Sequence, residues 1–528
     1  MCSKLFFHKI YIDLIKADIR NRKDLDYFKR KISKEYGVTL LKNSELLKIY
    51  HETASKPSLL LEALLRKRPV RSLSGIVNVS VLTKPYSCPG KCIFCPSQKN
   101  IPKSYMAGEP AVQRAILNKF NPYKQVAMRL KALQLTGHPV DKVELRIIGG
   151  TWSYYPTKYQ GWFVAECFRA CNKFSTRGQA SGSFPRTGLG MLQKQNEKAK
   201  SRIVGIAVET RPDYINASEI KLMRKLGITK VELGVQAVDD TILQLNQRGH
   251  SVESTVTATR LLKNAGFKVS YQMMPGLYGS NPKKDLAMFK EIFTNPDFKP
   301  DYLKIYPLAL VKNTKLYNLY KKRKFKPYTK KQLIKLLVEI KKIIPCWVRV
   351  ERIIRDIPPK DIVEGGSQNL NMREVVAKEM VKQGVACLCV RCREVRMNYN
   401  AKEKLKLFRQ EYEASGGREI FLSFENKSRT KLYALLRLRI TSATAIVREL
   451  HVYGQMAQIS TGKTGVSSAQ HTGLGKKLVA QAEKITKDSG VKKISVIAGV
   501  GVRPYFRQLG YKLQNTYMIK SLSPRNAD

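Results

Sequence analysis

The sequence predicts an α/β fold: a (βα)6 partial barrel, then a separate α+β domain, with a basic helical segment before both. Six short β-rich apolar segments alternate with helical stretches between about residues 76 and 310, a pattern typical of parallel strands joined by helices. From about residue 396 the pattern changes to consecutive antiparallel strands, followed by one helix and two further strands. We therefore divide the 528 residues into segments 1–75, 76–320, 321–395 and 396–528.

The barrel strands are expected at residues 76–82, 143–148, 203–208, 230–235, 269–273 and 302–305. Barrels of this kind bind ligands at the C-terminal ends of their strands. The residues at those ends that we expect to bind a cofactor are Gly149, Gly150, Thr151, Glu209 and Gln236. Glycine at this position lets the backbone approach a ligand closely.

The chain is strongly basic, with 96 Lys and Arg against 41 Asp and Glu and a formal net charge of +55. Such an excess along the whole chain indicates a long nucleic acid as partner. The alternative is a solvated surface on a protein from a Lys-rich proteome. Residues 311–345 combine basic charge with Tyr317, Tyr320 and Tyr328, which suits a phosphate backbone and stacked bases, although a solvated helix face explains the same charges.

Cysteine usage and hydropathy bear on the compartment. Six of the ten cysteines fall into two tight groups, which indicates metal ligation in a reducing compartment. The apolar stretch in the first ten residues is interrupted by His8 and Lys9 and has no small-residue cleavage site, so we expect no signal peptide. No apolar run approaches the roughly 20 residues that span a bilayer. We expect a cytoplasmic protein with no membrane partner.

The first cysteine group is a CxxxCxxC motif. Cys88, Cys92 and Cys95 lie in SCPGKCIFCP, directly after the first barrel strand. Three thiolates can hold three irons of a 4Fe-4S cluster and leave the fourth iron open to a ligand. In the radical S-adenosylmethionine superfamily that ligand is the methionine part of S-adenosylmethionine, whose cleavage releases a 5′-deoxyadenosyl radical. The alternatives are a zinc knuckle without its fourth ligand, or chance.

The second cysteine group is a CxCxxC motif between the barrel and the C-terminal domain, formed by Cys387, Cys389 and Cys392. Three soft ligands this close favour a structural zinc ion, with a fourth ligand that the sequence does not identify. A redox role or simple burial is the alternative interpretation.

A glycine motif in the C-terminal domain predicts an acetyl-CoA site. Gln470-His471-Thr472-Gly473-Leu474-Gly475 opens a helix that runs through 477–487. It matches the QxxGxG pattern of GNAT acetyltransferases, in which backbone amides at a helix N-terminus bind the pyrophosphate of CoA. The motif follows a β-meander and precedes a strand at 494–498, the order that a GNAT fold requires; a generic phosphate loop is the alternative.

Many GNAT enzymes use a tyrosine to protonate the departing CoA thiolate. That position is Phe506 here, and the adjacent Tyr505 would replace it if its side chain points toward the site.

Motifs along nearly the whole chain resemble the Elongator catalytic subunit and its single-chain archaeal and bacterial relatives. These motifs are PVRSLSG at 69–75, CIFCP at 92–96, VDKVELRIIGGT at 140–151, VETRPDY at 208–214, ELGVQ at 232–236, RGH at 248–250, RDIP at 355–358, RELHVYG at 448–454 and QHTGLG at 470–475. The chain departs from the family at Met106 and Ala107, where threonine and glycine are usual, and at Phe506.

The resemblance implies a reaction that neither domain signature gives by itself. The 5′-deoxyadenosyl radical would abstract hydrogen from the methyl group of acetyl-CoA, and the carbon radical would add to C5 of the wobble uridine in tRNA. Hydrolysis of the thioester would leave 5-carboxymethyluridine. The basic segment 1–75 would bind the tRNA.

The resemblance also implies roles for individual residues. Cys88, Cys92 and Cys95 would hold the cluster. The residues that would contact acetyl-CoA are Lys142, Glu449, Leu450, His451, Val452, Leu474, Gly475, Lys476 and Phe506. Contact between Lys142 and acetyl-CoA requires the two active sites to face each other; a surface lysine is the ordinary interpretation.

Two other functions remain as alternatives. A protein lysine acetyltransferase would need the C-terminal domain but would leave the cysteine loop and the basic surface unexplained. A tRNA-binding scaffold with decayed sites is opposed by the intact cysteines and the intact glycine motif. The sequence leaves open whether the chain works by itself, as a homo-oligomer or with Elongator-like accessory subunits.

Overall fold

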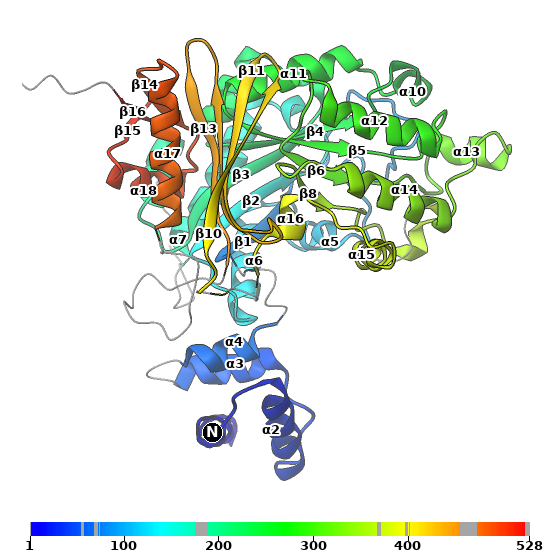
Figure 1. Ribbon diagram of the computed structural model, residues 1–528. Coiled ribbons are helices and arrows are strands. Elements are labelled where there is room, and N and C mark those ends of the chain that lie inside the picture. The colour runs from blue at the N-terminus through cyan, green and yellow to red at the C-terminus, as the bar shows by residue number, and fades with distance from the viewer. Residues whose placement is uncertain are drawn as a thin grey trace, which may run out of the picture.

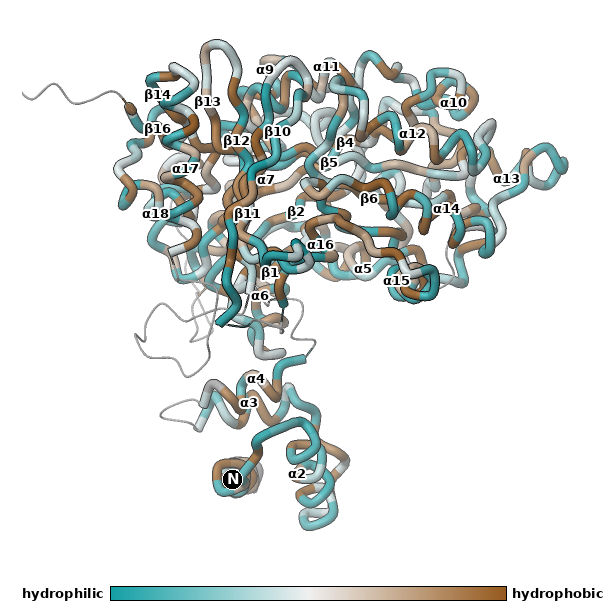
Figure 2. The backbone as a smooth tube through the Cα atoms, in the orientation of Figure 1, coloured by the Kyte–Doolittle hydropathy of each residue, from teal (hydrophilic) through white to brown (hydrophobic). Residues whose placement is uncertain are grey.

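The computed structural model describes residues 2–53, 58–67, 72, 74–174, 188–366, 371–396, 400, 402–454 and 473–522. The N-terminal helices form a small bundle beside a large body, and that body contains two seven-stranded sheets (Figure 1). The hydrophobic residues are concentrated in those sheets and in the helix faces that cover them (Figure 2).

The N-terminal bundle consists of four helices with a core of their own. They are α1 (Cys2–Lys16), α2 (Arg22–Glu35), α3 (Asn43–Thr53) and α4 (Leu59–Leu65). Leu14, Phe28 and Tyr50 belong to a buried cluster that is separate from the main core. Asn21 caps the N-terminus of helix α2, and its side chain accepts a hydrogen bond from the backbone N–H of Asp24 in a capping box.

The first large sheet is the predicted parallel half-barrel, with one strand more than expected. Its order is β1-β2-β3-β4-β5-β6-β8 and all its pairs are parallel. The strands are β1 (Ile76–Leu82), β2 (Lys142–Ile148), β3 (Arg202–Thr210), β4 (Lys230–Gln236), β5 (Lys268–Met273), β6 (Tyr302–Ile305) and β8 (Arg349–Arg352). The six expected strands are confirmed. Strand β8 comes from segment 321–395 and pairs with β6, so part of that segment extends the barrel sheet.

Helices surround this sheet, and several of them pack against its strands. They are α5 (Pro110–Leu117), α6 (Pro122–Leu135), α7 (Thr157–Lys173), α8 (Leu189–Asn196), α9 (Ala217–Lys225), α10 (Asp240–Leu245), α11 (Val252–Asn264), α12 (Pro282–Thr294), α13 (Lys315–Lys321), α14 (Lys330–Ile343), α15 (Met372–Lys382) and α16 (Val390–Arg393). The short strands β7 (Ala309–Leu310) and β9 (Glu364–Gly365) pair with each other. Strand β2 shows the two faces of the sheet: Val143, Leu145 and Ile147 are buried in the core, and the alternating residues between them are polar.

The second sheet forms the C-terminal domain in the order β10-β11-β12-β13-β14-β16-β15. Its strands are β10 (Leu405–Ala414), β11 (Gly417–Asn426), β12 (Leu432–Ile440), β13 (Ala445–Val452), β14 (Lys493–Val496), β15 (Lys512–Gln514) and β16 (Tyr517–Ser521), with helices α17 (Leu474–Asp488) and α18 (Arg503–Gln508). We expected two strands after α17, but the described residues there form three, of which β15 and β16 make a hairpin.

Strands β13 and β14 pair in parallel over Ala445–Val447 and Ile494–Val496. Beyond these residues β13 continues to Val452 without β14 beside it. Among the described residues, no strand pairs with this edge of β13 near its C-terminal end, so the edge is available to a ligand. Within the described part of the chain, no helix has both the length and the apolar character that a bilayer span requires.

Candidate active site

The loop after β1 carries the first cysteine group at the C-terminal end of the parallel strands, as predicted. Cys88, Cys92 and Cys95 are partly buried free thiols. Arg248 donates a hydrogen bond from Nη1 to Sγ of Cys92 at 3.5 Å. Gly90 gives the loop the space it needs, because a Cβ atom there would lie 2.6 Å from Nη1 of Arg211. The guanidinium groups of Arg248 and Arg211 thus lie beside the cysteine loop.

The distances between the sulfur atoms differ between the two cysteine groups and indicate different metal centres. Among the described residues, Cys387, Cys389 and Cys392 form the one set of three potential ligands whose atoms all lie within 4.8 Å of one another. A single zinc ion with bonds of about 2.3 Å keeps its thiolates about 4 Å apart. The loop at 88–95 spreads its sulfurs more widely than that, which fits a cluster of several irons. Burial raises the pKa of the Cys95 thiol to about 11, and the two neighbouring thiols add to the rise.

The turn after β2 brings its residues to the cysteine loop. Gly149 and Gly150 have φ values of +117° and +60°. A Cβ atom on Gly149 would lie 2.4 Å from Oγ1 of Thr83, so glycine is required there. Oγ1 of the buried Thr151 lies 3.9 Å from Sγ of Cys88. This part of the predicted ligand site is assembled at one place.

Two other predicted residues have different environments. Glu209 accepts hydrogen bonds from the hydroxyl group of Tyr105 at 2.6 Å and from Nζ of Lys304 at 3.1 Å. Its carboxylate is therefore held by the barrel itself. Gln236 adopts φ of +70° where the β4–β5 register shifts, which turns the end of the strand.

Sequence reasoning gave no role to the charged residues inside the half-barrel. Arg146 on β2 donates to Glu232 on β4 at 3.0 Å, and Lys230 lies 3.3 Å from the same carboxylate. Lys304 on β6 also pairs with Glu232. Buried charges of this kind are tolerated when they are paired. The signal was present in the alternation of Lys142, Glu144 and Arg146, which places the three on one face of β2.

Two quoted motifs also acquire contacts that the sequence did not assign. Arg248 of the RGH motif binds Cys92, and it also donates to the carbonyl of Gly234 at 2.6 Å. Arg355 of the RDIP motif donates to Oγ of Ser104 at 2.9 Å and to Glu109 at 3.0 Å, and so fixes the chain beyond the cysteines. The departure at Met106 fills a small buried cluster that includes Ile357.

The C-terminal domain packs against the opposite end of the barrel strands. Arg448 donates to the carbonyl of Phe267, just before β5, at 2.8 Å, and to Oδ2 of Asp301, just before β6, at 2.7 Å. Arg349, the first residue of β8, donates to the hydroxyl group of Tyr453 at 3.1 Å. The domain therefore lies at the N-terminal ends of the strands, whereas the cysteine loop lies at their C-terminal ends.

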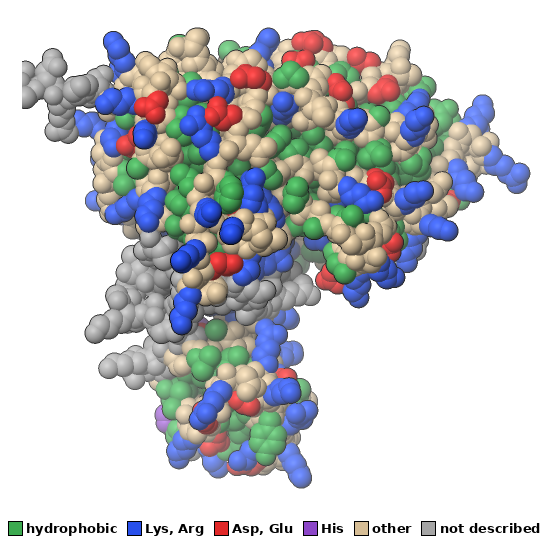
Figure 3. Space-filling view, in the orientation of Figure 1, with side chains coloured by type: hydrophobic (Ala, Val, Ile, Leu, Met, Phe, Trp, Pro, Cys, Tyr) green, Lys and Arg blue, Asp and Glu red, His purple; other side chains and the backbone are tan. Residues whose placement is uncertain are grey.

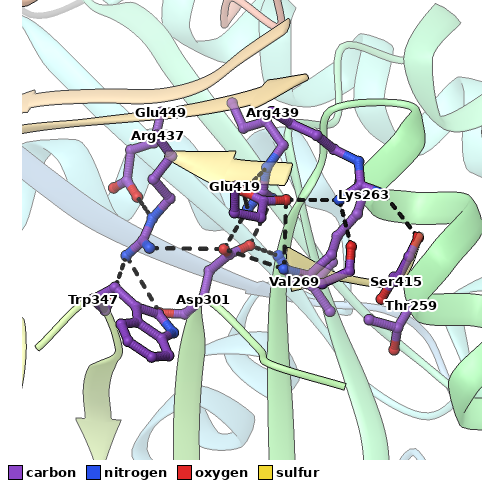
Figure 4. A network of polar contacts seen from close by, with 12 residues as sticks. Thr259, Lys263, Val269, Asp301, Trp347, Ser415, Glu419, Arg437, Arg439 and Glu449 are labelled. Atoms are coloured by element: carbon purple, nitrogen blue, oxygen red, sulfur yellow. Dashed lines mark hydrogen bonds and ion pairs between the residues drawn. The ribbon is translucent and has the colours of Figure 1, made fainter. Parts of the chain in front are cut away.

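A buried network of charges joins the two parts at this interface (Figure 4). Arg437 donates to Glu449 at 2.8 Å and Arg439 donates to Glu419 at 3.0 Å, both within the C-terminal domain. Asp301 of the barrel pairs with Arg448 and lies 3.7 Å from Arg437. Burial by itself would raise the pKa of Asp301, but the charges of Arg448, Lys263 and Arg437 outweigh it and hold the pKa well below its ordinary value.

The first turn of α17 lies next to the open edge of β13. Gly473 has φ of +81° and begins the helix. A Cβ atom on Gly475 would lie 3.7 Å from Val452, 3.9 Å from Leu450 and 3.0 Å from the hydroxyl oxygen of Tyr505. The helix N-terminus, the end of β13 and Tyr505 thus converge. Leu474 is buried, Lys476 is exposed, and Gln470 lies outside the described residues.

The structure distinguishes Tyr505 from Phe506. Phe506 is buried against Tyr511, whereas the hydroxyl group of Tyr505 points to the first turn of α17. Burial raises the pKa of Tyr505, which keeps the phenol protonated. Of the two residues, it is therefore Tyr505 that directs a polar group at the first turn of α17.

Lys142 lies at the end of the barrel that faces the C-terminal domain, because it is the first residue of β2. Burial lowers its pKa below the ordinary value for lysine. In the C-terminal domain, burial lowers the pKa of His451 to about 4, although the charges of Glu449, Glu394 and Glu144 act to raise it. The Glu449 side chain is bound by Arg437 and by the hydroxyl group of Tyr302, so its carboxylate supports the interface.

The second cysteine group has a cationic neighbour. Lys341 of α14 is buried and donates from Nζ to Sγ of Cys392 at 3.6 Å. Cys387 and Cys389 are buried and Cys392 is exposed. Their close packing fits a single soft metal ion.

A parallel half-barrel with a three-cysteine loop at its C-terminal edge defines a radical S-adenosylmethionine protein, and two family models agree. The Radical SAM superfamily model matches residues 83–292, and the model of the Radical_SAM C-terminal domain matches residues 300–382.

Two similar proteins span nearly the full length of the chain. A tRNA uridine(34) acetyltransferase from Methanocaldococcus infernus is 46% identical over 92% of this chain and 92% of its own length. Elongator complex protein 3 from Homo sapiens is 35% identical over 94% of this chain and 93% of its own length. In addition, a solved structure of Elp3 from Methanocaldococcus infernus, with an N-terminal deletion, is 42% identical. It covers 85% of this chain and 100% of its own, with a TM-score of 0.72. The chain belongs to the family of tRNA uridine(34) acetyltransferases and Elongator complex protein 3.

Proposed function

We propose that this protein modifies the wobble uridine of tRNA by carboxymethylation at C5, with acetyl-CoA as the carbon source and S-adenosylmethionine as the radical source. The family supports the tRNA substrate, since relatives that match over nine-tenths of the chain carry the name tRNA uridine(34) acetyltransferase. The observation that carries the proposal is that one molecule contains two sites: a loop with three thiols at one end of the half-barrel, and a helix that begins after Gly473 at the other.

Cys88, Cys92 and Cys95 would hold the 4Fe-4S cluster, with Arg248 and Thr151 beside the sulfurs. When bound, the cluster supplies the electron that cleaves S-adenosylmethionine to a 5′-deoxyadenosyl radical. Gly149 and Gly150 expose backbone groups next to Thr151, where the methionine end of the ligand would lie.

In the C-terminal domain the free N–H groups of the first turn of α17 would bind the pyrophosphate of acetyl-CoA. The unpaired edge of β13, with Leu450 to Val452, would hold the pantetheine chain. Tyr505 would donate a proton to the thiolate that leaves on hydrolysis. Lys142 would face the thioester from the barrel side.

We infer that Cys387, Cys389 and Cys392 bind zinc. The site lies between α14 and the barrel strand β8, since Lys341 of α14 contacts Cys392 and the N–H of Val390 donates to the carbonyl of Val348 at 2.9 Å. A metal there would join this connecting segment to the barrel.

The decisive experiment uses tRNA as substrate under anaerobic conditions. The full-length protein, reconstituted with iron and sulfide, is incubated with tRNA, reductant, S-adenosylmethionine and acetyl-CoA labelled with ¹³C in the acetyl group. We expect labelled 5-carboxymethyluridine in nucleoside mass spectrometry, and none with Cys92→Ser. Failure to form the labelled nucleoside with an intact cluster would refute the proposal.

The competing function is lysine acetylation of a protein. It predicts that Cys92→Ser acetylates a protein substrate at the wild-type rate. The engagement of Glu449 with Arg437 and Tyr302 argues against it, because this carboxylate is not free to deprotonate a lysine.

A further inference from the structure

The segment that contains α13 is the most concentrated patch of positive charge in the described barrel. Residues 311–331, which we call the basic arm, contain nine Lys and Arg and no Asp or Glu. The nine are Lys312, Lys315, Lys321, Lys322, Arg323, Lys324, Lys326, Lys330 and Lys331, and every one is exposed. In the described part of the chain, none of them is paired with a carboxylate. Their charge is therefore available to a partner.

The basic arm projects from the end of the barrel opposite the C-terminal domain (Figure 1), and Lys and Arg side chains gather at its tip (Figure 3). This is the end at which the cysteine loop lies. A partner bound to the arm would consequently lie over the entrance to the cysteine site and not over the acetyl-CoA site.

The base of the arm contacts the cysteine loop itself. The N–H of Leu316 donates to the carbonyl of Ile93, between Cys92 and Cys95, at 2.9 Å. Leu316 and Ile93 are both buried in one hydrophobic cluster, and Tyr317 and Tyr320 pack against it with their rings stacked at 6.1 Å. The sequence suggested these two tyrosines for base stacking, but in the structure they pack against the buried cluster and so hold α13 in place. The outer surface of the arm therefore consists mainly of Lys and Arg side chains.

We propose that the basic arm binds the phosphate backbone of an RNA helix and so holds the RNA at the entrance to the cysteine site. The inference rests on the proposed function, which makes tRNA the substrate. It adds the place on the protein where that RNA is held. A run of four adjacent exposed cations, Lys321 to Lys324, suits the closely spaced charges of a nucleic acid backbone. Because Leu316 is bonded to Ile93, RNA held by the arm has a fixed position relative to the three thiols.

The test compares two variants that lose the same charge. The arm variant carries Lys321→Gln, Lys322→Gln, Arg323→Gln and Lys324→Gln, and leaves Leu316, Tyr317 and Tyr320 unchanged. The control carries Lys484→Gln, Lys487→Gln, Lys492→Gln and Lys493→Gln on and after α17, at the other end of the molecule; these four are also exposed. Iron content after reconstitution verifies that both variants keep an intact cysteine site.

Binding of fluorescently labelled tRNA is measured by anisotropy over a range of KCl concentrations. For the arm variant we expect binding roughly tenfold weaker, and a slope of log affinity against log salt reduced by about 3, since each lost phosphate contact removes about 0.7–0.9. The control should keep the wild-type slope to within about one contact.

Two outcomes would overturn the inference: equal slopes for the arm variant and wild type, or equal losses in both variants. A third would replace it: if the arm variant lost binding to phosphatidylserine vesicles but not to tRNA, the partner would be an anionic lipid surface. If wild-type protein itself bound no tRNA, the proposed function and not the arm would be at fault.

Discussion

Buried cations in this protein are matched by partners that lie far away in the sequence. Lys341 is 2% exposed, and the residues next to it on α14 are Ile340 and Lys342, neither of which is an acid. Its Nζ donates to Sγ of Cys392, 51 residues later. A buried ammonium group without a counter-charge is costly. If the second cysteine group binds zinc as we propose, its thiolates would provide the negative charge that Lys341 needs, and Lys341 would in turn stabilise the site.

We expect Lys341→Met to weaken zinc binding at the second cysteine group by roughly tenfold, because the charge-assisted contact to Cys392 contributes on the order of 1–2 kcal/mol. The rate of zinc transfer to a chromogenic chelator measures this. Lys342→Met is the matched control, since Lys342 is the next residue on α14 and is exposed in a pair with Glu339. Identical transfer rates in both variants would show that Lys341 does not stabilise the site.

At the scale of the element, the local sequence pattern was sufficient to predict the six strands β1 to β6 but not the short strand β8. Strands β1 to β6 were predicted to within two residues at each end, because each is a short segment rich in apolar residues between helical stretches. Strand β8 was not predicted and falls in segment 321–395, since Arg349, Glu351 and Arg352 give it a polar composition. Its place in the sheet depends on pairing with β6, which no local pattern reports.

Glycine is required in the turn after β2 but not within helix α7. Gly149→Ala should destabilise the protein by at least about 2 kcal/mol, because φ is +117° and Cβ would collide with Thr83. Gly161→Ala, in the middle of α7 where an added Cβ meets nothing within 4 Å, should stabilise it by about 0.5–1 kcal/mol.

Urea denaturation of both glycine variants measures these changes. Gly149→Ala should also bind less S-adenosylmethionine after reconstitution, while Gly161→Ala should bind it as wild type does. A stable Gly149→Ala protein with normal binding would contradict the role of this turn.

At the scale of the whole molecule, the buried charge network makes the barrel and the C-terminal domain one unit. Asp301→Asn should cost about 3–5 kcal/mol, because it leaves Arg448 without its buried counter-charge. In thermal unfolding, we expect either that the single transition of the wild type splits into two or that its midpoint temperature falls markedly. Asp297→Asn, at an exposed carboxyl group four residues earlier, is the control and should change little.

The same network predicts a pH dependence. The pKa of Asp301 is lowered in the folded protein, so its contribution to stability is complete above the unfolded value of about 3.9 and is lost as the pH falls below it. The stability difference between wild type and Asp301→Asn should therefore shrink below about pH 4. A difference that stays constant in acid would mean that the lost charge is not the cause.

The positions of the two sites predict that their activities can be separated. Strand β2 has seven residues and spans about 20 Å, with Lys142 at one end and the turn beside the cysteine loop at the other. Tyr505→Phe should slow tRNA-dependent hydrolysis of acetyl-CoA by roughly 10²-fold, the scale of a lost general acid, and leave cleavage of S-adenosylmethionine unchanged. Cys92→Ser should abolish cleavage and leave acetyl-CoA binding intact, as measured by calorimetry. Loss of both activities in Tyr505→Phe would contradict this separation.

The sequence by itself determined the fold class, the order of the long strands and the two cysteine groups, because hydrophobic periodicity and ligand spacing are local properties of the chain. It also indicated Tyr505 as a substitute for the tyrosine missing at Phe506. The tertiary structure decided where Tyr505 points, that Lys142 lies at the C-terminal-domain end of the barrel, and that Arg248, Arg355 and Lys341 contact residues more than 50 positions away. Those contacts depend on how strands and domains pack, and packing brings together side chains that local patterns do not relate.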